Sequence, residues 1–111
     1  MENSDREVLL KMLKHADHAI SYAGKYESRE AFESDEMCVE ATVFNIMQIG
    51  ELAKSSLSEE LKAAIQSIPW NQIYGLRNRI VHGYEGVNLS IVWDTINEDL
   101  PDMVREIKKH I

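Results

Sequence analysis

Three polar residues of the kind that bind phosphate and transfer protons lie close together in the chain: Arg77, Asn78 and His82. A guanidinium can hold a phosphate through two parallel hydrogen bonds. An imidazole gains and loses a proton near neutral pH, and a carboxamide can orient it or donate to a phosphate oxygen. Composition and spacing alone favour the alternative of a solvated helix face that ends in a histidine, which the helix dipole stabilises.

The segment that carries these residues is expected to be a helix from Pro69, which suits a first helical turn, to about His82. At ~100° per residue, three apolar residues fall within about 60° of one another and should form the core stripe. They are Ile73, Leu76 and Ile80. Asn78 then lies about 170° from that stripe, with His82 one turn beyond it on the same outward side.

The rest of the chain predicts further helices and no convincing strand, because no long run alternates apolar and polar residues. We expect helices over residues 5–26, 34–55, a short stretch after Ser58, and a last helix after Asn88 that kinks or restarts at Pro101. The second of these is apolar on two faces and should be the central helix. One face holds Val39, Val43, Ile46, Gly50 and Ala53, and the other Met37, Ala41 and Phe44. The predicted fold is an all-α antiparallel bundle of four to five helices.

Length and composition fit a single domain over residues 1–111 that folds around one core. Apolar runs are far below the ~20 residues that cross a bilayer, so we expect no membrane partner. A lone cysteine, Cys38, agrees with a cytoplasmic protein. Twelve basic and 19 acidic residues give a net charge of −7, which disfavours the binding of nucleic acid. However, residues 61–84 contain three basic and no acidic residues.

The segment 77–84, Arg-Asn-Arg-Ile-Val-His-Gly-Tyr, contains the Arg-x4-His signature of HEPN domains and resembles its extended form in HepT-like toxins. Three further regions resemble the same family in the right order. Residues 44–54 resemble its second-helix segment with an Ile-Gly-Glu core, 68–70 its entry into the motif helix, and 86–88, 91–93 and 99–101 its final helix. The likeness extends over residues 35–109. One departure is Glu85, where the family usually has an aromatic residue.

This resemblance implies a helical bundle that forms a homodimer and acts as a metal-independent endoribonuclease with no cofactor. RNA supplies its own nucleophile, the 2′-hydroxyl, so the enzyme has to move protons and stabilise the phosphorane. It implies catalytic roles for Arg77, Asn78 and His82. Because one chain offers one motif histidine, a two-fold dimer with two His82 side chains in one cleft makes chemical sense.

The family also implies a partner, a minimal nucleotidyltransferase antitoxin that adenylylates the motif tyrosine, here Tyr84. The alternative for Tyr84 is a side chain that closes the helix end. Arg79 either assists RNA binding or pairs with an acid. Three polar residues of the predicted second helix either line the same cleft or form a buried polar contact between helices: Asn45, Gln48 and Glu51. A rival hypothesis for the whole chain is a non-catalytic HEPN module that binds a nucleotidyltransferase or a nucleotide.

Overall fold

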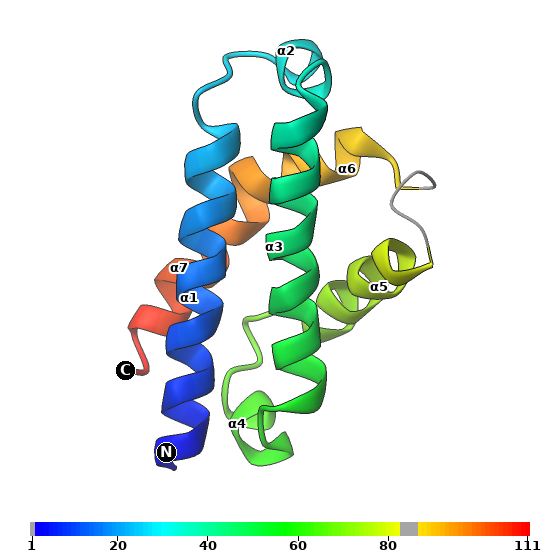
Figure 1. Cartoon of the computed structure of the whole chain (residues 1–111). Coiled ribbons are helices and arrows are strands. Elements are labelled where there is room, and N and C mark those ends of the chain that lie inside the picture. The colour runs from blue at the N-terminus through cyan, green and yellow to red at the C-terminus, as the bar shows by residue number, and fades with distance from the viewer. Residues whose placement is uncertain (1, 83–86) are drawn as a thin grey trace.

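A computed structural model describes residues 2–82 and 87–111, and every regular element within these ranges is helical. Two long helices, α1 (Asn3–Ala23) and α3 (Glu36–Ser55), lie side by side in opposite directions (Figure 1). The remaining elements are α2 (Arg29–Glu33), α4 (Glu59–Ala64), α5 (Trp70–Val81), α6 (Leu89–Asp94), a π-helical turn (Thr95–Asp99) and α7 (Leu100–Lys108). The predicted all-α bundle is confirmed.

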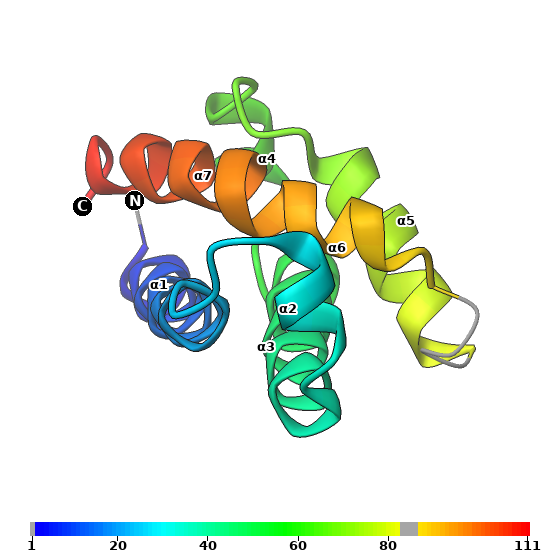
Figure 2. The ribbon, with the colours of Figure 1, turned by 90° about the horizontal axis from the view of Figure 1, so that it is seen from above.

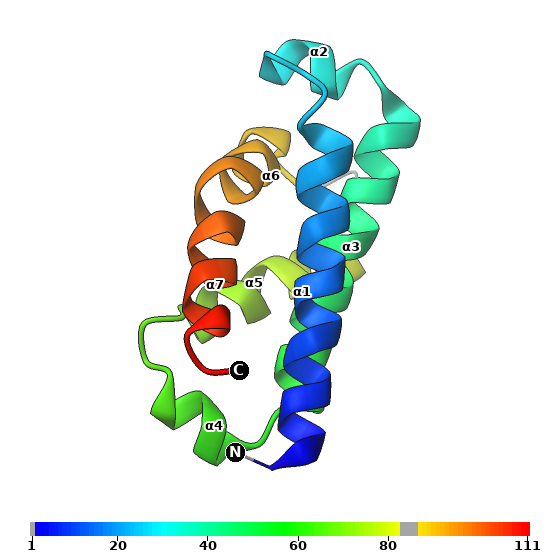
Figure 3. The ribbon, with the colours of Figure 1, turned by 90° about the vertical axis from the view of Figure 1, so that its left-hand side faces the viewer.

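Packing against the long pair arranges the other helices. The segment from α6 to α7 crosses one side of α1 and α3, whereas α5 lies against α3 away from α1 (Figures 2 and 3). One apolar core joins them, and its largest fully buried side chains are Phe32, Leu9, Met12, Ile49, Ile65, Ile68, Ile107 and Val92. The main neighbour of α5 is α3, so the motif helix lies at the edge of the bundle.

Capping residues set the helix starts largely as predicted. The Asp35 carboxylate accepts the Cys38 N–H at 3.1 Å, and the Ser58 hydroxyl accepts the Leu61 N–H at 3.2 Å. The first helix ends earlier than predicted, at Ala23 rather than residue 26. Residues 29–33 lie between the first two predicted helices, but they form α2, in which Phe32 is fully buried.

The predicted kink at Pro101 takes the form of a wider turn immediately before the proline. The Leu100 N–H bonds to the carbonyl of Thr95, five residues back, which is the π-helical spacing. Pro101 has no N–H to donate to the preceding turn. The helix therefore continues through the proline into α7, after a local expansion at residues 95–99.

The helix α3 is central, as predicted, since α1 packs on one side of it and α5 on another, but its second apolar face is not buried. The face that carries Val39, Val43 and Ile46 is buried, as predicted. On the other face, Met37 is 78% exposed and Phe44 is 52% exposed. None of the described helices covers them, because α1 packs on the first face and α5 near the other end. We call Met37, Ala41 and Phe44 the α3 stripe.

Across the residues that the structure describes, no helix is both long and apolar enough to cross a membrane.

Candidate functional site

The motif helix approaches α3 very closely at one glycine. A β-carbon added at Gly50 would lie 2.4 Å from Cβ and 2.9 Å from Cγ of Arg77, closer than real β-carbons approach other atoms. Only glycine therefore permits this crossing of α3 and α5. The close approach fixes where the stem of Arg77 leaves α5.

The residue after this glycine orients the arginine. The Arg77 Nε donates to Glu51 Oε2 at 2.7 Å, and one terminal nitrogen lies 2.5 Å from the same oxygen. The other terminal nitrogen donates to Asn78 Oδ1 at 2.9 Å. The hydrogen bond and positive charge of Arg77 lower the pKa of Glu51 below its usual range. Glu51 is therefore a carboxylate at neutral pH and holds the guanidinium in one orientation.

The Arg77 guanidinium retains hydrogen-bonding capacity beyond these contacts. It has five N–H groups in a planar fork. Its contacts with Glu51 and Asn78 use Nε and one N–H of each terminal nitrogen, so each terminal nitrogen keeps one N–H without a partner among the described residues. Since the side chain is still 21% exposed, these two N–H groups can reach an anion from solvent. Donors held in a fixed plane are suited to phosphate oxygens.

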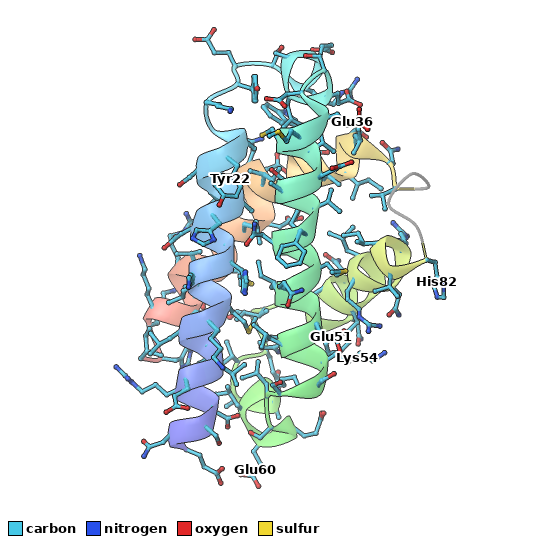
Figure 4. All side chains as sticks on the ribbon, in the orientation of Figure 1. Tyr22, Glu36, Glu51, Lys54, Glu60 and His82 are labelled. Carbon is cyan, nitrogen blue, oxygen red and sulfur yellow. The ribbon has the colours of Figure 1, made fainter. Side chains whose placement is uncertain are left out.

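Asn78 and His82 are both exposed, as the predicted outward face requires. The N–H of His82 donates to the carbonyl of Asn78 at 3.2 Å and ends α5. Figure 4 shows the His82 side chain at the free end of α5, pointing away from the bundle. The structure thus brings Arg77, Asn78 and Glu51 into direct contact and places His82 one turn further along, in solvent.

The other residues singled out in the sequence are more dispersed. Asn45 is buried, donates to the carbonyl of Ala41, and has its Oδ1 2.8 Å from His15 Nδ1. It therefore forms a polar contact between α3 and α1, away from Arg77. Gln48 is half-buried on α3, between Asn45 and Glu51. Tyr84 lies outside the described residues.

Arg79 is exposed and lines a cavity of about 430 Å³ between α3, α5 and the α6–α7 segment. Two members of the predicted core stripe, Ile73 and Leu76, are only half-buried because they face this cavity, whereas Ile80 is buried. Thr95 and Asp99, from the π-helical turn, also line it. Removal from water, together with the charges of neighbouring carboxylates, raises the pKa of Asp99.

Sequence reasoning did not find the role of Gly50, which it placed only on a core face, nor the cavity with Thr95 and Asp99. The signal in the sequence that could have indicated the role of Gly50 is a glycine directly before an acidic residue inside a predicted helix. Among residues 2–82 and 87–111, no group of three or more His, Cys, Asp or Glu side chains is arranged to hold a metal ion.

Comparison with known proteins gives a consistent result. A family profile described as "Ribonuclease HepT-like" matches residues 12–110. "Putative RNase TTE0752" of Caldanaerobacter subterraneus subsp. tengcongensis is 34% identical over 82 residues, which cover 74% of this chain and 72% of that protein. "Probable ribonuclease HepT" of Thermococcus cleftensis is 29% identical over 86 residues, with 74% and 77% covered. No solved structure gives a significant match.

Proposed function

The chain belongs to the HepT-like ribonuclease family, and from that premise we propose that it is a metal-independent endoribonuclease whose site is Arg77, Asn78 and His82. The observation that carries the proposal is the Arg77 guanidinium. Glu51 and Asn78 fix its plane, its side chain is partly exposed, and the exposed His82 lies about one turn further along the same helix. That arrangement is suited to holding a phosphodiester next to a proton carrier.

In the proposed reaction the ribose 2′-hydroxyl attacks the adjacent phosphorus, and the bond to the 5′-oxygen of the next nucleotide breaks. The products are a 2′,3′-cyclic phosphate and a free 5′-hydroxyl. A base has to take the 2′-hydroxyl proton, and an acid has to protonate the leaving oxygen. His82 serves as one of these groups, while Arg77 stabilises the negative charge on the phosphorane.

The direct test is incubation of the purified protein with RNA in the presence of EDTA. We expect fragments that end in a 2′,3′-cyclic phosphate, at the same rate as without EDTA. A protein that binds RNA or a nucleotide without producing fragments would instead support the rival function of a non-catalytic binding module.

The homodimer belongs to this proposal because acid–base cleavage needs two proton carriers and each chain offers one motif histidine. The α3 stripe supports it. Its members are spaced four and three residues apart on one exposed helix face, and the same spacing leads on to Gln48 and Glu51. A second copy that covers the stripe would therefore lie next to the arginine. Burying Met37 and Phe44 would also remove two large apolar side chains from water.

Phe44→Glu is expected to convert the dimer into a monomer, since a carboxylate would have to be buried without a partner. Light scattering measures the change as a halving of the mass. Leu10→Glu is the matched control, because it introduces the same charge at an exposed apolar residue of α1, outside the stripe. A Phe44→Glu protein that remains dimeric would exclude the α3 stripe as the interface.

Control by a minimal nucleotidyltransferase antitoxin completes the proposal. The tyrosine that the antitoxin would modify is Tyr84 of this chain, which comes two residues after His82. The phenol oxygen would attack the α-phosphorus of ATP, pyrophosphate would leave, and the phenol proton would pass to a base. The added phosphodiester would repel the RNA phosphate beside His82 and stop cleavage.

Such modification should raise the mass of the intact protein by one or more adenylyl units, after incubation with the nucleotidyltransferase and ATP. Tyr84→Phe should show no increase under the same conditions. An increase that survives this substitution would assign the modification to another residue.

A further inference from the structure

Gly75 of α5 lies at the cavity between α3, α5 and the α6–α7 segment, and no packing contact within residues 2–82 and 87–111 requires a glycine there. A β-carbon added there would meet no atom within 4 Å, in contrast to Gly50. Its backbone is not in the left-handed region that favours glycine. Because glycine weakens a helix relative to alanine, a glycine that internal packing does not require indicates close approach by something outside the chain.

The position of Gly75 on α5 connects the cavity to the motif. Asn78, Arg79 and His82 follow it by three, four and seven residues, which places all of them on neighbouring parts of one helix face. Gly75 and Arg79 line the cavity, whereas Asn78 and His82 face solvent. A chain that lies across the motif can therefore enter the cavity over the glycine.

We propose that this cavity is a subsite for one nucleobase of the RNA substrate, next to the scissile phosphate. The proposal rests on the ribonuclease function proposed above. The cavity measures about 430 Å³, within the range of small-molecule sites. Aliphatic side chains such as Ile46, Leu76 and Met103 provide flat apolar walls for the faces of a base.

Polar groups at the same cavity fit the edge of a base and its phosphate. Asn71, Gln72 and Asp99 offer carboxamide and carboxylate groups of the kind that bond the Watson–Crick edge of an unpaired base. Arg79 provides a cation for the phosphate that follows. An apolar side chain of a second protein would leave these polar groups without partners on burial. A nucleobase can pack its faces against the apolar side chains and hydrogen-bond its edge to the polar ones, so we favour it as the occupant.

The test uses Gly75→Leu, which fills the mouth of the cavity while improving helix propensity. Its probes are the four ribonucleoside monophosphates, titrated into the full-length protein and followed by NMR, alongside steady-state cleavage of RNA. We expect at least one monophosphate to bind the wild type and to bind Gly75→Leu about 10-fold more weakly, with a similar rise in KM for RNA. Ser21→Leu, on the exposed side of α1, adds the same side chain elsewhere and should behave as the wild type.

Asp99→Asn is the second variant, since it preserves the cavity volume and changes only the hydrogen-bonding edge. We expect it to alter which monophosphate binds best. Monophosphate binding that is absent in the wild type, or unchanged in both variants, would overturn the proposal. So would a Gly75→Leu protein that loses its dimeric state, because the cavity would then belong to a protein interface. Failure of the wild type to cleave RNA would contradict the ribonuclease function instead, whatever the binding result.

Discussion

Replacing His82 with alanine is expected to reduce RNA cleavage by about 10²–10⁴-fold, the usual contribution of a general acid or base. The fold should be unaffected because the side chain is exposed at the end of α5 and packs against nothing in the core. Single-turnover cleavage of a defined RNA measures the rate. Circular dichroism and thermal unfolding establish that the bundle is intact.

The matched control for this prediction is His110→Ala. His110 is also exposed and follows the last helix, so the substitution removes the same titratable group far along the chain from the motif. It should leave cleavage at the wild-type rate. A His82→Ala protein that cleaves as fast as the wild type would reject the proton-transfer role, although Arg77 could still bind phosphate.

Local sequence rules correctly predicted the helical class and most of the helix starts. Asp35 and Ser58 cap helices as expected, since a capping side chain bonds to an N–H only a few residues away. The outward position of Asn78 and His82 also followed from helix geometry alone. These features depend on neighbours in the sequence, so the sequence contains the information that decides them.

Features that depend on distant contacts were less predictable. An apolar stripe on α3 looks the same in sequence whether this chain or another covers it, so the sequence does not show that Met37 and Phe44 are exposed. The half-buried state of Leu76 has the same origin, because no pattern within α5 shows how far away α6 and α7 lie. The short helix α2 has a similar origin, because the burial of Phe32 against the core stabilises a helix within a charged stretch.

Gly50 and Glu51 divide the task of positioning the arginine between them. The glycine lets α5 come close enough for the Arg77 stem to pass over α3. The glutamate then binds Nε and one terminal nitrogen, which fixes the plane of the guanidinium. Neither residue needs to touch the substrate. Both are positioning residues, and the adjacent pair explains physically why an Ile-Gly-Glu segment accompanies the arginine motif in this chain.

Gly50→Ala is therefore expected to destabilise the contact between α3 and α5 and to displace Arg77. A methyl group 2.4 Å from Arg77 Cβ cannot be accommodated, and the nearby backbone carbonyl of Ile73, 3.3 Å away, limits the movement of α5. Overpacking of this kind costs about 1–3 kcal/mol of stability. A shift of Arg77 by about 1 Å would lower cleavage by about 10²-fold. Chemical denaturation and the cleavage assay measure the two effects.

Gly75→Ala is the matched control for the stability measurement alone, because it makes the same substitution in the motif helix where a β-carbon meets nothing within 4 Å. It should raise the free energy of unfolding by about 0.5–1 kcal/mol through helix propensity alone. The same glycine-to-alanine substitution is thus expected to lower the free energy of unfolding at residue 50 and to raise it at residue 75. If Gly50→Ala were equally stabilising and fully active, α5 could position Arg77 without the close crossing. In that case the Glu51 carboxylate alone would orient the guanidinium.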